Sequence, residues 1–144
     1  MAKVSLFDEV GGLATLERVH KIFYDKIYVH PWIGKFFEGH DQLAIEGRQT
    51  SFMMEKMGGP KEYTGKPLTM SHRQMYITEE LFQVRKALLT EALHEFGLNE
   101  MLIDRWLKID GAFKKHIVKN SIEDFYKTTF RYEQRVIIPK ENIS

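Results

Sequence analysis

The stretch that decides the fold is TEELFQVRKALLTEALHEFG, residues 78–97. Its apolar residues recur at intervals of three and four, which places them along one face of an α-helix. The residues of this face are Leu81, Phe82, Leu88, Leu89, Ala92, Leu93 and Phe96. Thr78 is a favourable N-cap, and the two glutamates that follow it suit the positive end of the helix dipole. Gly97 ends the pattern, so we expect one long amphipathic helix between these two residues.

Three other segments, at about 13–28, 41–57 and 99–117, have the same helical spacing. A His-Pro pair closes the first segment, because proline restricts the residue before it, and Gly-Gly-Pro stops the second. The third starts at Asn99 and is expected to keep one inner face to its end, made of Leu102, Ile103, Trp106, Leu107, Phe113 and Ile117. No segment before the tail alternates convincingly with a period of two. The sequence therefore predicts an all-α fold with four principal helices.

Two stretches do not fit a regular helix. Residues 58–71, GGPKEYTGKPLTMS, contain three glycines and two prolines and are expected to form an irregular loop before the helix that decides the fold. Residues 121–144 mix aromatic and polar side chains, and their last part, PKENIS at 139–144, is typical of a frayed end. We expect a single domain over 1–120 and a C-terminal extension over 121–144.

Composition narrows the classes of function. The formal net charge of the 144 residues is +1, so there is no excess positive charge to attract nucleic acid or an anionic membrane. We find no apolar run of the roughly 18 residues that a membrane span needs and no secretion signal, and we expect a cytoplasmic location. The chain has no cysteine, which excludes disulfides, thiolate metal sites and a CxxCH haem attachment. A metal site would therefore use His, Met, Tyr or carboxylate ligands.

Four local motifs, in order and spacing, give a more specific indication. They are LFDEVGG (6–12), FYDKIYVHPWIGKFF (23–37), RQTSFMMEKMGG (48–59) and LTMSHRQMYIT (68–78). Together they resemble the truncated, or 2-on-2, haemoglobins, and most closely their first group, in register from about Ser5 to Ile117. The resemblance implies a globin-like sandwich of two helices over two around a haem, with an irregular loop on the proximal side. It implies one haem b as the cofactor.

The resemblance also assigns roles to residues near the iron. His72 matches the proximal ligand, and a neutral imidazole opposite an open position is what a gas-binding haem requires. Tyr24 matches the distal tyrosine, although a tyrosine there can also be an ordinary core residue with its hydroxyl bonded to a neighbour. Gln49 matches a distal polar residue on the facing helix. Ile45 takes the position where many globins place a distal His or Gln.

Other matched residues would hold the haem. Arg48 stands where some relatives have a second histidine, and its forked donors suit a haem propionate. Lys66 can reach the second propionate or remain solvated. Phe37 matches the aromatic residue that wedges the haem plane. The remaining candidates for the wall are Phe36, Phe52, Leu68, Met75 and Phe82.

Three functions remain open at this level. The first is reversible oxygen binding at ferrous haem, with oxygen or another diatomic gas as the ligand. The second is a nitric oxide dioxygenase or peroxidase, for which a separate reductase would supply electrons because the sequence shows no flavin or nicotinamide domain. The third is a haem-based gas sensor, or a haem-free helical interaction module in which His72 is an ordinary loop residue.

Overall fold

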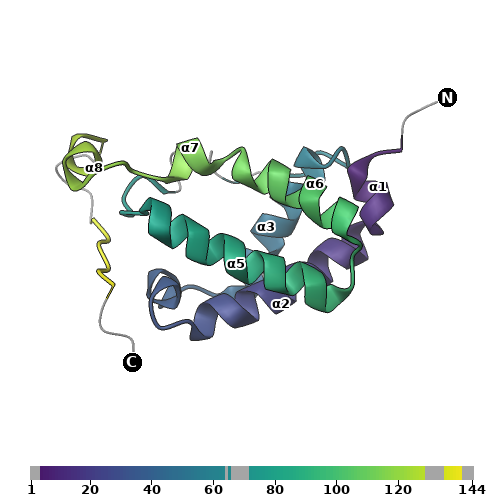
Figure 1. The fold of residues 1–144 in the computed structure, drawn as a ribbon, viewed down its shortest axis with the longest axis horizontal. Coiled ribbons are helices and arrows are strands. Elements are labelled where there is room, and N and C mark those ends of the chain that lie inside the picture. Colours follow the sequence, from purple (N-terminus) through teal and green to yellow (C-terminus); the bar gives the residue numbers. More distant parts are fainter. Residues whose placement is uncertain (1–3, 64, 66–71, 129–134, 141–144) are drawn as a thin grey trace.

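Two pairs of long helices form the body of the protein (Figure 1). α2 packs against α3 and α5, and α5 packs in turn against α6. The computed structural model describes residues 4–63, 65, 72–128 and 135–140. Its elements are α1 (Leu6–Val10), α2 (Leu13–Val29), the 3-10 helix η1 (Ile33–Phe37), α3 (Gln42–Lys56), α5 (Glu79–Phe96), α6 (Glu100–Gly111), α7 (Lys114–Ile117) and α8 (Ile122–Thr128). The expected all-α fold with four principal helices is confirmed.

The structure shows three of the predicted capping residues at the ends of their helices. The Thr78 hydroxyl accepts a hydrogen bond from the Leu81 backbone N–H at 3.1 Å, so α5 begins at the next residue after Thr78. Asn99 caps α6 in the same way, with its side-chain oxygen 2.9 Å from the Leu102 nitrogen. Gly97 ends α5 with a φ of 100°, a left-handed conformation that glycine adopts without strain.

The fourth helical segment differs from the prediction, because it is broken near its end. α6 ends at Gly111, and the short helix α7 begins only at Lys114. Glycine is a weak helix former, and the Ala112 backbone N–H is shared between the carbonyls of Lys108 and Ile109. After the break, α7 runs on from α6 toward the end of the molecule where α8 lies (Figure 1).

Gly34 determines how closely η1 lies against the end of α2. A Cβ atom at this position would lie 2.7 Å from the Ile27 carbonyl oxygen and 3.0 Å from that of Tyr28. Only a residue without a side chain allows this approach. It brings η1 beside α2, so that the Phe37 ring packs against the Tyr24 ring with their centroids 5.9 Å apart.

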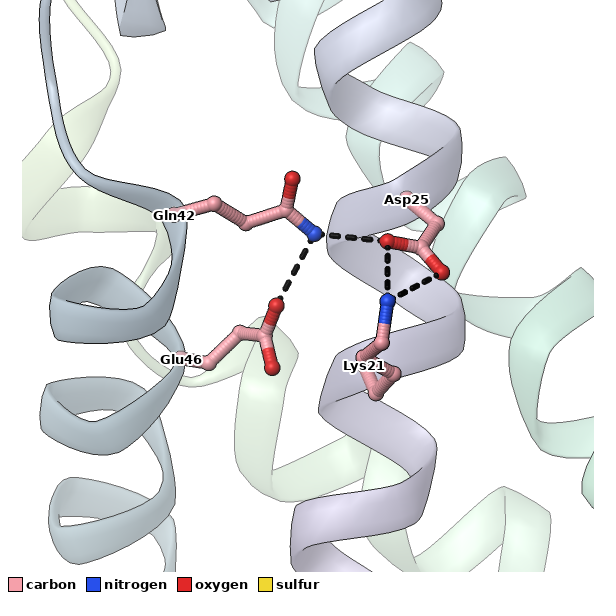
Figure 2. A network of polar contacts seen from close by, with 4 residues as sticks. All are labelled: Lys21, Asp25, Gln42 and Glu46. Atoms are coloured by element: carbon pink, nitrogen blue, oxygen red, sulfur yellow. Dashed lines mark hydrogen bonds and ion pairs between the residues drawn. The ribbon is translucent and has the colours of Figure 1, made fainter.

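An exposed polar network joins α2 to α3 (Figure 2). Lys21 and Asp25, one turn apart on α2, form an ion pair at 2.8 Å. The Gln42 amide nitrogen, on α3, donates to Asp25 Oδ1 at 2.7 Å and to Glu46 Oε2 at 2.9 Å. Exposed pairs of this kind stabilise a fold little. Their effect here is to connect the two helices at the surface.

The C-terminal segment is more ordered than the predicted frayed end. Residues 135–140 run beside the segment that follows His72, and Val136 exchanges backbone hydrogen bonds with Gln74 and Tyr76, at 2.7 and 2.9 Å. The Trp32 indole N–H donates to the Ile138 carbonyl at 2.8 Å, and Lys140 pairs with Glu80 at 2.6 Å. Residues 139 and 140, predicted as frayed, are therefore held, whereas 141–144 lie outside the described residues.

His20 lies in the core between α2, α3 and α6. Its Nδ1 lies 2.8 Å from the Thr50 hydroxyl oxygen, and its ring meets the Trp106 ring edge to face at 5.9 Å. Burial lowers the pKa of His20 to about 3, and the positive charge of Arg85 adds to this effect. His20 is therefore neutral in the folded protein at all but strongly acidic pH.

This burial predicts a pH dependence of stability. Between about pH 6.5 and pH 3 the unfolded chain binds a proton at His20 that the folded chain does not, so the free energy of unfolding falls as the pH falls, by about 1.4 kcal/mol per pH unit from this residue. We expect His20→Gln to reduce the slope by that amount in denaturant titrations at pH 6 to 4. Equal slopes in the two proteins would contradict this assignment.

No helix within the described ranges is both long and apolar enough to cross a membrane.

Candidate functional site

A cavity of about 540 Å³ is lined by residues of α2, η1, α3, α5, α6 and α7 and of the segments that connect them. Its size falls within the range of about 300–1,000 Å³ that is usual for small-molecule and cofactor sites. Ten of the residues predicted from the sequence line it together: Tyr24, Phe36, Phe37, Ile45, Arg48, Gln49, Phe52, His72, Met75 and Phe82. The other two predicted residues, Lys66 and Leu68, lie outside the described residues.

The walls of the cavity are mainly aromatic and aliphatic. Phe36, Phe52 and Phe82 are each at most 9% exposed. The Phe52 ring packs edge to face against Tyr63 and Phe113, at centroid distances of 5.3 and 5.1 Å. Such packing fixes the rings, and it leaves a rigid apolar space suited to a flat, largely apolar group.

Tyr24 is the main polar group on the α2 side of the cavity. Its side chain lines the cavity although the residue is only 5% exposed. Burial raises the pKa of Tyr24 to about 12, so the phenol keeps its proton at neutral pH and can donate a hydrogen bond. Within the described ranges, its hydroxyl has no hydrogen-bond partner of its own, which distinguishes it from an ordinary core tyrosine.

α3 contributes one face to the cavity. Ile45, Gln49 and Phe52 are spaced four and three residues apart, so they lie on the same side of this helix. Ile45 and Gln49 are half-buried, whereas Arg48 is exposed. Arg48 therefore lies at the rim, where a guanidinium can meet both the solvent and a carboxylate.

His72 also lines the cavity and lies in the chain between α3 and α5. It is half-buried. Its backbone carbonyl accepts hydrogen bonds from the Lys119 ammonium and from the Met75 N–H. These bonds hold the backbone that carries the imidazole.

The cavity wall also contains an ion pair that was not predicted from the sequence. Arg85 Nη1 donates to Asp110 Oδ2 at 2.6 Å, and the two side chains are 18% and 6% exposed. The guanidinium carbon lies 5.3 Å from the centroid of the Phe23 ring and 5.8 Å from that of Phe82. Burial by itself would lower the pKa of Arg85, but the charge and the hydrogen bond of Asp110 outweigh it and raise that pKa.

A signal for this pair was present in the sequence. Arg85 follows Phe82 by three residues and precedes Leu88 by three, so it occupies the apolar face of its helix. Asp110 follows Trp106 by four residues on the inner face of the next helix. One basic and one acidic residue, each inside an apolar stripe, indicate a buried pair between two helices. His40, Tyr63 and Gln74 also line the cavity, and no comparable pattern marks them.

The residues present fit a haem. Among the described residues, no three His, Asp or Glu side chains gather into a metal site of their own. His72 would supply the imidazole that ligates the haem iron, and the apolar walls of the cavity would enclose the porphyrin. The polar groups lie where a haem would use them, with Tyr24 and Gln49 inside the cavity and Arg48 at its rim.

Comparisons with known proteins point to one family. The family described as bacterial-like globin matches residues 5–130. A group 1 truncated haemoglobin of Mycolicibacterium paratuberculosis is 32% identical over 94 residues, which are 65% of this chain and 69% of that protein. A group 1 truncated haemoglobin of Tetrahymena pyriformis is 26% identical over 114 residues, 79% of this chain and 94% of the relative.

Solved structures show the same architecture. The crystal structure of the Fe(III) form of truncated haemoglobin from Tetrahymena pyriformis superposes with a TM-score of 0.77 at 24% identity, and the match covers 81% of this chain and all of that one. The 2/2 haemoglobin from Synechococcus, in the cyanomet state and with covalently attached haem, superposes with a TM-score of 0.72 over 78% of this chain and 94% of its own. The predicted sandwich of two helices over two is confirmed by this likeness.

Proposed function

Because this chain belongs to the bacterial-like globin family and is a truncated haemoglobin, whose family implies a haem cofactor, we propose that it binds oxygen reversibly at one ferrous haem b, in the cytoplasm. We propose His72 as the proximal ligand, and residues 1–120 as the globin domain with 121–144 as an extension. A ferrous haem held by His72 would supply the iron at which a diatomic gas can bind.

One observation carries this proposal. Tyr24, whose hydroxyl is protonated, and His72 line the same cavity, and the hydroxyl has no hydrogen-bond partner within the described part of the chain. A buried donor of this kind is directed at whatever enters the cavity. Oxygen, which accepts a hydrogen bond, satisfies this donor better than carbon monoxide, which accepts a hydrogen bond more weakly.

The other candidate side chains would contact either the gas or the haem. Gln49 would donate a second hydrogen bond to the gas, while Ile45 keeps the neighbouring position apolar. Arg48 at the rim would pair with one propionate, and Lys66 with the other. The aromatic wall would exclude water from the cavity and fix the plane of the haem.

The direct test is a set of absorption spectra of one purified sample. We expect a haem Soret band in the ferric and ferrous forms, and a stable oxygenated spectrum when the ferrous protein meets air. The oxygenated form should return to the ferrous form under vacuum. A protein that takes up no haem, or that is oxidised at once by air without an oxygenated spectrum, would refute the proposal.

A further inference from the structure

The Arg85–Asp110 pair lines the same cavity as Tyr24. The Arg85 guanidinium carbon is 5.3 Å from the ring centroid of Phe23, the residue that precedes Tyr24 on α2. The Phe23 and Tyr24 rings are themselves in contact, with centroids 4.9 Å apart. Arg85 therefore places a positive charge in the wall of the cavity, close enough to Tyr24 to act on it electrostatically.

A neutral gas does not require this charge. Tyr24 and Gln49 already supply hydrogen-bond donors to the cavity. Two apolar side chains of similar volume would fill the space of the ion pair, and such replacements are often neutral or stabilising because no charge has to lose its hydration. An ion pair in this wall thus points to a ligand that carries charge.

The Arg85 guanidinium has N–H groups besides the one that donates to Asp110. It carries five N–H groups, and within the described part of the chain its one hydrogen bond to another side chain is that from Nη1 to Asp110. The Arg85 side chain is 18% exposed and lines the cavity, so donors remain on the side that faces the open space. Asp110 fixes the orientation of the planar group from the other side.

We propose that Arg85 determines which anions enter this cavity, because its guanidinium binds a small planar monoanion with two oxygen atoms. The fork of a guanidinium matches two oxygen acceptors, which a single ammonium does not. The inference rests on the proposed function, because the anion would enter the haem cavity. Nitrite and formate are the simplest ions of this class.

Asp110 also limits the strength of binding. Its carboxylate lines the same cavity and keeps the net charge of the pair near zero. An anion therefore gains the hydrogen bonds of Arg85 and Tyr24 but little long-range attraction. We expect weak, reversible binding that Arg85 controls, rather than permanent occupation by anions from solution.

The experiment is a titration of the ferric protein with sodium nitrite and with sodium formate, followed by the Soret band. The main variant is the double substitution Arg85→Met with Asp110→Leu, which removes both charges and leaves neither buried alone. We expect both anions to bind about ten- to a hundredfold more weakly to it, as the loss of a charged hydrogen bond predicts. Arg105→Gln on the outer face of α6, whose partner is Glu9, is the matched control and should not change either affinity.

A second variant keeps the test decisive if the double variant does not fold. Arg85→Lys retains the positive charge but loses the two parallel N–H donors of the guanidinium. We expect it to weaken formate binding at least threefold. Unchanged nitrite and formate affinities in either folded variant would overturn the inference. Oxygen binding by the ferrous wild-type protein, measured on the same sample, separates the two proposals: if it persists while anion affinity does not depend on Arg85, only this inference fails.

Discussion

Replacing His72 by alanine is expected to remove the axial ligand and with it most of the retained haem. His72 would be the residue that bonds to the iron, so its loss is expected to remove a large part of the attachment of the cofactor. We expect the purified variant to show a strongly reduced Soret band and a changed coordination state, measured by absorption and resonance Raman spectra. Added imidazole should restore the spectrum of His72→Gly in part, because it fills the space of the lost side chain.

Two other histidines provide the controls. His94 lies on the exposed side of α5, bonded to Glu100 and to the Thr90 carbonyl, and His94→Ala should leave haem content unchanged. His40 lines the cavity but is exposed. If His72→Ala kept its haem with unchanged coordination while His40→Ala lost it, the assignment of the proximal ligand would be wrong.

Replacing Tyr24 by phenylalanine is expected to speed oxygen dissociation at least tenfold. The substitution removes only the hydroxyl, which keeps its proton because burial raises the pKa of Tyr24 to about 12. A hydrogen bond to a ligand with partial charge contributes about 1.5–3 kcal/mol, which corresponds to a ten- to hundredfold change in rate. Stopped-flow displacement of oxygen by carbon monoxide measures this rate directly.

Tyr28 is the matched control for this measurement. It lies one turn further along α2 and also packs against Phe37, but its hydroxyl donates to the His40 carbonyl at 3.1 Å. Tyr28→Phe should leave the dissociation rate of oxygen within a factor of two. Equal rates for wild type and Tyr24→Phe would remove Tyr24 from the mechanism.

Much of the fold followed from the sequence because its signals are local. The caps at Thr78 and Asn99 depend on a side chain and a backbone N–H only three residues away, so the pattern alone predicts them. The break after Gly111 was missed, since the apolar spacing continues across it to Ile117. The ordered segment 135–140 was missed because its partners, Trp32 and the residues around Tyr76, lie far away in sequence.

The sequence by itself determined which residues were candidates for the site, because His72, Tyr24 and Gln49 lie in short motifs whose order and spacing resemble one family. Only the tertiary structure decided that these side chains share one cavity and that Tyr24 is buried enough to keep its proton. The sequence places Arg85 and Asp110 each within an apolar stripe, but only the structure shows that they meet, because contacts between helices depend on how α5 and α6 pack. Periodicity places a side chain on a face of a helix, whereas packing decides what that face meets.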